Sequence, residues 1–506
     1  MNLRELVSRR GLYRLQMALF ALRRYVPGPL RQLLKPLYRR YWQRSARRRL
    51  AAALPQAAAE RPAAGYAIVC LAGIDWELRF QRPQQLLSRL AAAGHPVYYL
   101  RLDFCAGQHA EPLEPLAVNV FGLRLPGPAR LNIYQGLPSP EQVATWLAEL
   151  ETLAQEQALA EVVCLAHAPF WTPLALAARE KLGWRLVYDC LDEHAGFASN
   201  AAPVVAAEAR LLAGADLVLA TAQSLYEKCL PVARRCVRLP NAADVAHFAR
   251  PPAEHPLEDL PRPIIGYYGA LSEWFDAALL DVAAAAHPEW TFVLIGLNAN
   301  ADLRALERRP NVLLLGERPY VDLPAYLHAF DVAVIPFHVN ALTRATNPVK
   351  FYEYLAAGKP VVAVELPELA PFRGLFYPAT TPADFTLQLE AAVAERDPQR
   401  TAARVAAAQA NTWDERTAQL KSEIQQLYGR AVIVIVSYQN LDYLRLCLDS
   451  VWAKTEYPHY SVVVVDNASG PDVTAYLREA QTREPRLQVV FNQTNIGFAG
   501  ANNLPT

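Results

Sequence analysis

Short apolar runs alternate with amphipathic stretches along most of the chain, beginning at Tyr66. The runs are rich in Val, Ile and Leu, as expected of strands that are buried on both faces of a parallel sheet. The intervening stretches, such as Arg82–Ala93 and Pro203–Ala213, have the pattern of helices. This alternation predicts an α/β fold built on doubly wound parallel sheets. The first predicted strands are Ala67–Leu71, Val97–Leu100, Val162–Leu165, Leu186–Tyr188 and Leu217–Ala220.

Five prolines between residues 251 and 263 interrupt the alternation, which then starts again. Two α/β lobes, residues 63–250 and 251–428, are therefore expected, and the helical stretch Trp413–Tyr428 closes the second. Ligands bind in the cleft between such lobes, at the carboxyl ends of the strands. The predicted strands of the second lobe are Ile264–Tyr268, Phe292–Ile295, Val312–Leu315, Val332–Ile335 and Pro360–Val364.

The alternation starts a third time in residues 429–506. Val432–Val436 and Ser461–Val465 have the pattern of strands, and Leu441–Val451 that of a helix between them. At about 75 residues this segment is short for an autonomous nucleotide-binding domain. We expect a partial domain here.

Composition indicates a folded, intracellular chain. With 53% hydrophobic and 20% charged residues, the 506 residues can form an ample core and do not resemble a disordered protein. None of the seven cysteines forms a C-x-x-C pair, which favours buried free thiols in a reducing compartment over a disulfide or zinc framework. No apolar run is long enough to span a bilayer, and no signal-peptide pattern is present. We therefore expect a cytoplasmic protein.

Charge is distributed unevenly along the chain. Residues 1–50 hold 14 of the 50 Lys and Arg residues and one of the 49 acids, which leaves 36 basic and 48 acidic residues for the remainder. Within a predicted helical arm, residues 1–62, leucines line one face and arginines the other. Such an arm suits the inner surface of an anionic membrane. A solvated helical cap and a nucleic-acid arm are the alternatives, but no nucleic-acid module accompanies it.

The most informative segment is residues 347–363, NPVKFYEYLAAGKPVVA. It offers a loop, a short helix with Lys350 in its first turn, and a glycine–proline exit into a buried strand. A helix N-terminus attracts phosphate, and Lys350 adds positive charge. Glu353, one turn later, could accept hydrogen bonds from two ribose hydroxyls. The alternative is an exposed ion pair between Lys350 and Glu353.

This segment resembles the donor-binding motif of family 4 glycosyltransferases, which have the GT-B fold of two Rossmann-like lobes. Three further stretches agree with the family. Asp75–Gln85 contains the QRP helix start, Asn241–Asp244 with Phe248 resembles the link between the lobes, and Ile265–Leu271 resembles the strand and glycine turn that open the second lobe. The resemblance covers residues 65–428; it is specific for the fold and weak for the sugar.

The resemblance implies a nucleotide-sugar donor, a glycan or lipid-linked acceptor, retention of anomeric configuration, and no obligatory metal or other cofactor. It implies that Glu353 holds the ribose hydroxyls, while Lys350 and the backbone at Asn347 and Pro348 face the pyrophosphate or the sugar. Gly269 would let its turn approach the phosphates without a side chain in the way.

The chain departs from the family's pattern at two positions. Ala345 stands where the family often has a glutamate, eight positions before Glu353, and Ala270 stands where an arginine often follows the glycine turn. We expect Arg344 and Lys350 to supply the missing positive charge, since arginine binds phosphate bidentately. If they do not, the donor site is weakened or altered.

Candidates for catalysis follow two strands of the first lobe. His167 follows Val162–Leu165, in a region where the family often uses a histidine near the donor sugar. Asp192 and His194 follow Leu186–Tyr188 and could orient the acceptor hydroxyl or act as a base. The alternatives are a histidine satisfied by backbone groups and an Asp192 that caps the next helix. The sequence does not choose among the three residues.

The C-terminal segment has a signature of its own. The strand ending VVVDNAS at Val463–Ser469 is followed by NIGFAGANN at Asn495–Asn503. This resembles the opening of a family 2 glycosyltransferase, which has the GT-A fold, and it implies that Asp466 contacts a nucleoside. The family's Asp-x-Asp metal motif and its catalytic base fall beyond residue 506. We therefore expect no catalysis by residues 429–506 alone, and a chain that is truncated or is part of a longer two-transferase protein.

Together these patterns predict a glycosyltransferase acting in cell-surface polysaccharide or glycolipid assembly. A nucleotide-sugar epimerase of the same fold is one alternative, although the link between the lobes and the EYLAAGKPVV pattern favour the transferase. A non-catalytic nucleotide- or glycan-binding scaffold is the other, and the missing cations motivate it.

Overall fold

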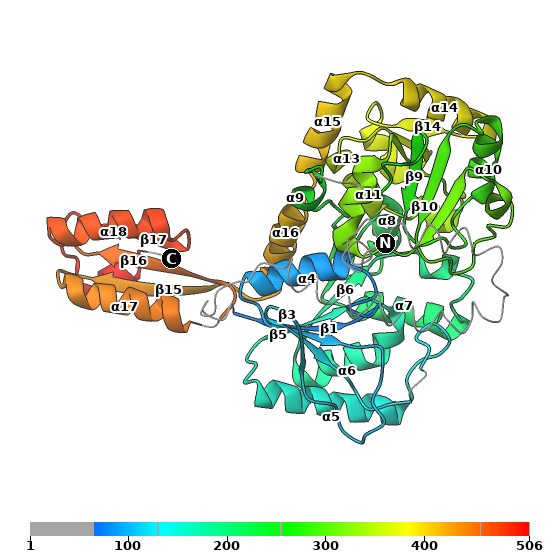
Figure 1. Ribbon diagram of the computed structural model, residues 1–506. Helices are drawn as coiled ribbons and strands as arrows, with labels where there is room; N and C mark the ends of the chain where they lie inside the picture. Colours follow the sequence, from blue (N-terminus) through cyan, green and yellow to red (C-terminus); the bar gives the residue numbers. More distant parts are fainter. Residues whose placement is uncertain (1–64, 129–130, 253–255, 456, 505–506) are drawn as a thin grey trace, which may run out of the picture.

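The computed structural model describes residues 65–128, 131–252, 256–455 and 457–504. Two α/β lobes form its body, and a smaller α/β unit lies to one side (Figure 1). Both lobes are built on largely parallel sheets, so the predicted α/β fold of two Rossmann-like lobes is confirmed. The basic arm, residues 1–62, lies outside the described residues.

The first lobe contains an eight-stranded sheet in the order β3-β4-β2-β1-β5-β6-β7-β8. Its strands are β1 (Ala67–Leu71), β2 (Val97–Leu100), β3 (Glu114–Ala117), β4 (Val120–Leu123), β5 (Val162–Ala166), β6 (Arg185–Cys190), β7 (Leu217–Ala220) and β8 (Cys236–Arg238). Its helices are α4 (Arg82–Ala92), α5 (Pro140–Glu156), α6 (Thr172–Leu182), α7 (Ala202–Gly214) and α8 (Gln223–Cys229). The strand order reverses at β1, between β2 and β5, which is where open α/β sheets bind ligands.

The second lobe repeats this plan with a six-stranded parallel sheet in the order β11-β10-β9-β12-β13-β14. Its strands are β9 (Ile264–Tyr268), β10 (Thr291–Ile295), β11 (Val312–Gly316), β12 (Val332–Ile335), β13 (Val361–Val364) and β14 (Tyr377–Ala379). Its helices are α10 (Ala277–Ala286), α11 (Leu323–Ala329), α12 (Ala341–Arg344), α13 (Val349–Ala356), α14 (Pro382–Ala394) and α15 (Pro398–Gln409). Here the order reverses at β9.

Local sequence fixes the starts of the helices that border the cleft. The Gln81 N–H donates to the Gln84 side chain at 3.1 Å, and a proline occupies the first turn of α4, where its missing N–H costs nothing. α12 begins at Asn340, whose side chain accepts from the Thr343 N–H at 3.0 Å. α13 begins after Pro348. These caps therefore define where α4, α12 and α13 begin.

The chain crosses between the lobes twice. It leaves the first lobe before the short helix α9 (Val245–Phe248) and returns in α16 (Trp413–Gln425), which lies against α4 (Figure 1). The Ala243 N–H donates to the Asn411 carbonyl at 3.1 Å, and the Trp413 N–H donates to the Ala243 carbonyl at 3.3 Å, so the crossings lie side by side. By packing, α16 belongs to the first lobe, whose core receives Trp413, Leu420, Ile424 and Tyr428.

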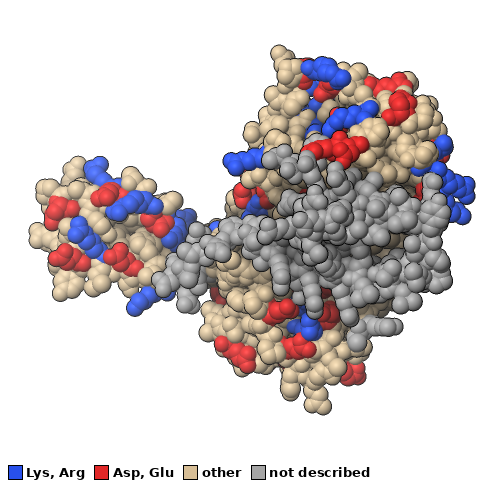
Figure 2. Space-filling model, in the orientation of Figure 1, with Lys and Arg blue, Asp and Glu red and all other residues tan. Residues whose placement is uncertain are grey.

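The third unit is a three-stranded parallel sheet in the order β15-β16-β17. Its elements are β15 (Ala431–Ser437), α17 (Leu441–Lys454), β16 (Tyr460–Asp466), α18 (Pro471–Arg483), β17 (Leu487–Phe491) and α19 (Gly497–Asn502). The helices α17 and α18 cover one face, where Leu448, Val464 and Leu477 are buried. Lys and Arg side chains are interspersed with Asp and Glu on the visible face of this unit (Figure 2).

Several predictions made from sequence need correction. The short strands β3, β4, β8 and β14 were not expected, because three or four residues give too little periodicity to separate them from loops. All seven cysteines are free, as predicted, but Cys447 is exposed rather than buried. Among the described residues no helix has the length and apolar character needed to cross a membrane.

Candidate active site

Two glycine turns, packed against each other, form the switch point of the second sheet. Gly269 and Gly296 follow β9 and β10 with φ angles of 144° and 157°. The Gly269 N–H donates to the Ile295 carbonyl at 2.8 Å, and a Cβ on Gly296 would lie 1.7 Å from the Gly269 oxygen. Because neither position accepts a side chain, the backbone at the end of β9 stays open to a ligand.

Lys350 extends from the first turn of α13 to this glycine turn. A Cβ on Gly269 would lie 2.8 Å from Cε and 3.2 Å from Nζ of Lys350. The ammonium also lies over the rings of Tyr267, at 5.5 Å, and Phe337, at 5.2 Å. Burial lowers the pKa of Lys350 to about 8, and the charge of Glu353 opposes this shift. The cation is thus held, poorly solvated, where a phosphate would meet the turn.

Glu353 lies one helical turn later and is only 5% exposed. Its Oε2 accepts a hydrogen bond from the Tyr268 hydroxyl at 2.8 Å. Burial raises the pKa of Glu353 to about 7, against the opposing effects of the Tyr268 hydrogen bond and the Lys350 charge. The alternative of an exposed ion pair with Lys350 is wrong, because the carboxylate is buried and Tyr268 is its hydrogen-bond partner.

Asn347 is buried and its side chain is fully engaged in joining the lobes. Its Oδ1 accepts from the Asn241 N–H at 3.1 Å, and its Nδ2 donates to Glu368 at 2.8 Å and to the Tyr352 hydroxyl at 3.1 Å. Its carbonyl accepts from the Asn241 side chain at 2.6 Å. The first turn of α13 remains for a ligand at this end. Its Phe351 N–H already donates to the Pro348 carbonyl at 3.0 Å, while the N–H groups of Val349 and Lys350 have no partner within the helix.

Arg344 ends α12 and is exposed. It makes no ion pair with the described residues, so it is available to an anion. Ala345, which takes the place of the family's earlier glutamate, is buried in the core cluster of the first lobe. A glutamate at this position would bury a charge between the lobes, which gives a physical reason for the alanine in this arrangement.

His167 faces the switch point of the first sheet. His167 follows β5, and its backbone N–H donates to the Leu71 carbonyl at 3.0 Å. The residue is buried, with 2% of its surface exposed. Nδ1 lies 3.5 Å from the Cys70 sulfur and Nε2 lies 3.9 Å from Asp189 Oδ2. Burial lowers the pKa of His167 to about 4, against the opposing charge of Asp189. The imidazole is therefore neutral at pH 7, and Nε2 has no hydrogen-bond partner among the described residues.

Behind His167 lies a buried ion pair that sequence reasoning missed. Arg82 donates from Nε and Nη2 to the Asp189 carboxylate at 2.9 Å, and from Nη1 to the Leu239 carbonyl at 2.9 Å. It also reaches Asn241 Oδ1 at 3.4 Å. The fork thus joins α4, β6 and the link between the lobes. The one signal in the sequence was an aspartate inside an apolar strand, which requires a buried partner.

Asp192 and His194 follow β6, at the same edge of the sheet as His167. Burial raises the pKa of Asp192, His194 opposes this and Asp189 adds to it. Burial lowers the pKa of His194, whose Nε2 has no hydrogen-bond partner in the described chain. Glu193, not Asp192, caps the following turn, by accepting from the Ala195 N–H at 3.4 Å. The capping alternative for Asp192 is therefore wrong.

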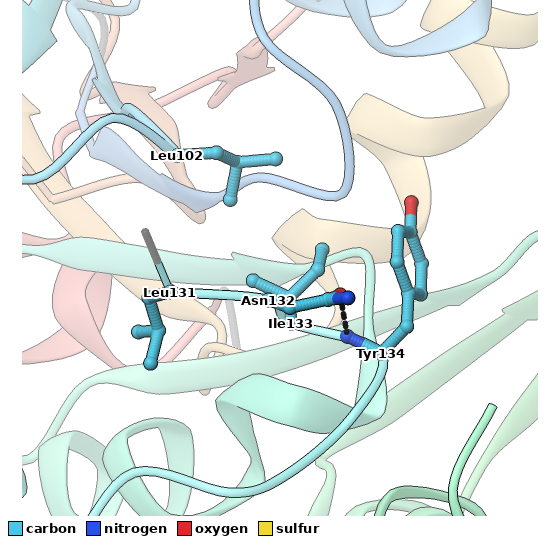
Figure 3. A pocket seen from close by; sticks show the side chains of 5 residues that line it. All are labelled: Leu102, Leu131, Asn132, Ile133 and Tyr134. Carbon is cyan, nitrogen blue, oxygen red and sulfur yellow. Dashed lines mark hydrogen bonds between the residues drawn. The ribbon is translucent and has the colours of Figure 1, made fainter. Parts of the chain in front are cut away.

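A small cavity of about 280 Å³ lies beside these residues and is lined by Leu102, Leu131, Asn132, Ile133 and Tyr134 (Figure 3). The Asn132 side chain accepts from the Tyr134 N–H at 3.0 Å, which fixes the loop. The Tyr134 hydroxyl lies 3.5 Å from the Gly73 carbonyl, and Gly73 in turn packs against His167. The cavity therefore borders the first-lobe candidates, and its lining is mainly apolar.

Asp466 ends β16 in the third unit and is buried. Its Oδ1 accepts from the Ser469 N–H at 3.3 Å, and Asn467 bonds to Asn492 and Asn495. Within the described residues no group of three or more His, Cys, Asp and Glu side chains is arranged around a metal-sized site. Asp466 lies in the unit beyond Tyr428, apart from the glycine turn of the second lobe.

Comparison with known proteins agrees with this geometry. Residues 262–395 match the family model described as glycosyl transferases group 1, and residues 432–504 match that of glycosyl transferase family 2. A protein of Bacillus subtilis (strain 168), named as the teichuronic acid biosynthesis glycosyltransferase TuaH, is 27% identical over 202 residues, which are 36% of this chain and 51% of that protein. The chain thus matches about half the length of this curated relative.

Solved structures share the fold of the two lobes. Sucrose-phosphate synthase from Thermosynechococcus elongatus superimposes with a TM-score of 0.54 at 16% identity, over 72% of this chain and 99% of that one. Anabaena HepE, solved with UDP and glucose, gives 0.51 at 19% identity, over 71% and 99%. The trehalose-6-phosphate synthase OtsA gives 0.56 at 12% identity, over 71% and 99%. The two lobes therefore have the GT-B fold, with a second-lobe stretch that matches the model of glycosyl transferases group 1 and a C-terminal segment that matches the model of glycosyl transferase family 2.

Proposed function

We propose that residues 65–428 transfer a sugar from a nucleotide-sugar donor to a glycan or lipid-linked acceptor, with retention, in the assembly of a cell-surface polysaccharide. The observation that carries this proposal is the convergence of the Gly269 turn, Lys350 and Glu353 at the switch point of the second sheet. The relative named for teichuronic acid biosynthesis supports the polysaccharide context.

Each part of the donor has a matching group in this site. The Gly269 turn, which carries no side chain, would let the diphosphate approach. The first turn of α13 would face the diphosphate, since helix N-termini attract anions. Lys350, with Arg344 at the end of α12, would neutralise the charge that develops on the leaving diphosphate. The Glu353 carboxylate would accept from the ribose hydroxyls, and its contact with Tyr268 holds it in place.

The acceptor would approach from the first lobe. His167, Asp192 and His194 share the edge of its sheet, and Nε2 of the neutral His167 imidazole is free to accept or donate a hydrogen bond, depending on the tautomer. A carboxylate such as Asp192, with its pKa raised by burial, is suited to take the proton of an acceptor hydroxyl. These residues are proposed for this role because of their position in the first lobe. Variants of them should therefore affect transfer to the acceptor without affecting donor binding.

The Glu353→Gln variant tests the proposal. The amide accepts the Tyr268 hydrogen bond but is a weaker partner for a diol than a carboxylate, so nucleoside and nucleoside diphosphate affinity should both fall by about 1–3 kcal/mol. Isothermal titration with UDP, ADP and GDP would measure it, after a thermal-shift screen with the corresponding nucleotide sugars. Unchanged nucleotide binding would remove Glu353 from the site.

A non-catalytic binding scaffold is the second candidate, and two observations favour it: Ala270 and Ala345 replace charged residues of the family's pattern. Slow hydrolysis of the donor without acceptor distinguishes the two. A transferase releases free sugar from its donor, whereas a scaffold that binds the same nucleotide sugar leaves it intact.

A further inference from the structure

One arginine of the first lobe lies at the donor side of the cleft and has no role in the proposal above. Arg79 lies in the loop between β1 and α4, and its Nε donates to Glu317 Oε1 of the second lobe at 3.0 Å. Their side chains are 28% and 38% exposed, so water and ligands can reach both. The ion pair therefore spans the cleft at a position open to exchange.

The position of this pair relative to the glycine turn follows from backbone contacts. Glu317 directly follows Gly316, whose carbonyl accepts from the Gly296 N–H at 3.0 Å. Gly296 in turn packs against Gly269. The Glu317 carboxylate thus lies at the same edge of the second sheet as the turn that would bind the diphosphate. Its ion pair with Arg79 places the Arg79 guanidinium at this edge as well.

Arg79, on the first lobe, also interacts electrostatically with Lys350, on the second lobe. Its charge acts on both Lys350 and Tyr267, the residues that flank the glycine turn. Two cations that act on each other in this way repel each other unless an anion lies between them. A diphosphate is an anion of suitable charge for that place.

The chain directly after Arg79 is anchored by contacts with the second lobe and by the start of α4. The ring of Phe80 packs on Tyr320 of the second lobe at 5.1 Å, and Gln85 Nε2 donates to the Tyr320 hydroxyl at 2.8 Å. The capping box at Gln81 fixes where the loop ends. The backbone of Arg79 is therefore held against the second lobe while its side chain can exchange partners.

We propose that Arg79 is a diphosphate-binding residue supplied by the first lobe, which takes over the role of the arginine absent at Ala270, and that Glu317 holds it in position until a donor arrives. The inference rests on the proposed nucleotide-sugar function. A guanidinium matches phosphate oxygens bidentately, so the donor would replace one carboxylate partner by a stronger anionic one. The two lobes would then both bind the leaving group.

Two variants that break the same ion pair test this inference because they should act in opposite directions. Arg79→Gln should weaken binding of UDP, ADP or GDP, whichever binds the unmodified chain, by about 10- to 100-fold, with the matching nucleoside unaffected. Glu317→Gln should tighten nucleoside diphosphate binding several-fold, since it removes the competing carboxylate and a negative charge. The double variant should behave as Arg79→Gln does. Isothermal titration at fixed salt measures all of these affinities.

The matched control is Arg124→Gln, since Arg124 is a first-lobe arginine of similar exposure, 29%, that pairs with Glu111 and Asp103 on the same lobe. It should leave all affinities unchanged. If both Arg79→Gln and Glu317→Gln weaken binding, the pair only holds the lobes together and the inference is overturned. Binding that Arg79→Gln leaves unchanged also overturns it. Absence of any nucleoside diphosphate binding by the unmodified chain would instead overturn the proposed function.

Discussion

Burial brings the pKa values of Lys350 and Glu353 close to neutral pH. Their ordinary pKa values lie far apart, but burial lowers that of Lys350 to about 8 and raises that of Glu353 to about 7. Each charge opposes the shift of the other. The charge of the proposed donor site therefore depends on pH in the range where the enzyme would work.

We predict that nucleoside diphosphate affinity falls as the pH rises through about 8. Lys350 is charged below its lowered pKa and loses its proton above it, while the phosphates are already fully ionised. The loss should approach about tenfold per pH unit above pH 8 if the charged amine is required. Titration calorimetry from pH 6.5 to 9.5 measures it.

Lys350→Gln supplies the control for this prediction, because it should bind weakly and without this pH dependence. The nucleoside alone should show no loss in either protein. If the pH dependence of nucleoside diphosphate affinity persists in Lys350→Gln, a group other than Lys350 is responsible for it.

Sequence found the residues of the donor site that lie close together along the chain and missed those that meet only in three dimensions. Lys350 and Glu353 were predicted because one helical turn brings them together, and Gly269 because Ile265–Leu271 resembles the strand and glycine turn of family 4 glycosyltransferases. Arg82 and Asp189 lie 107 positions apart, and Arg79 and Glu317 lie 238 apart. No local pattern specifies such pairs; the fold does.

At the start of α4, the buried fork of Arg82 fixes the helix to β6 and to the link between the lobes. Methionine fills a similar volume but leaves Asp189 with no counter-charge in the core. We predict that Arg82→Met lowers the free energy of unfolding by about 3–5 kcal/mol, measured by urea denaturation.

Two comparisons separate charge from packing in that experiment. The double variant Arg82→Met with Asp189→Leu should regain much of the loss, since it removes both buried charges. The half-buried Arg124, whose acidic partners are about half exposed, should change stability by only about 0–1 kcal/mol when replaced by methionine. Equal losses in the single and double Arg82 variants would show that the fork acts through packing.

Strands and helices with strong periodicity were predicted closely, and the misses have physical causes. Val332–Ile335 and Leu217–Ala220 match β12 and β7 residue for residue. Hairpin strand β3 is short and partly exposed and carries little apolar pattern, and β4 is apolar but has only four residues, too few to show a period. The position of α16 could not be predicted from chain order, because its apolar face fits the first lobe although it follows the second.

The third unit presents apolar side chains to solvent, among them Tyr443 at 72%, Leu446 at 67% and Phe498 at 75% exposure. Such surface favours association.

We predict that a chain shortened to residue 428 keeps the full transferase activity, remains active in EDTA and is more soluble than the 506-residue chain. Turnover of the donor and light scattering measure this. Activity that requires Mn²⁺ or Mg²⁺, or that disappears with Asp466→Ala, would place the chemistry in the third unit.

The basic arm is predicted to bring the protein to anionic membranes. Removal of residues 1–55 should leave the two lobes folded and abolish sedimentation with phosphatidylserine vesicles, because each basic residue near the surface contributes about 1 kcal/mol. Neutral vesicles are the control. Sedimentation of the shortened chain with anionic vesicles at moderate salt would show that another surface makes the contact.

The side-by-side crossings at Ala243 and Asn411 limit how the two lobes can move. The two crossings are hydrogen-bonded to each other and would act as one hinge. A rotation of the lobes about this hinge would keep both hydrogen bonds, whereas a translation of one crossing past the other would break them. Because α16 moves with the first lobe, everything attached after Tyr428 would swing with the acceptor side.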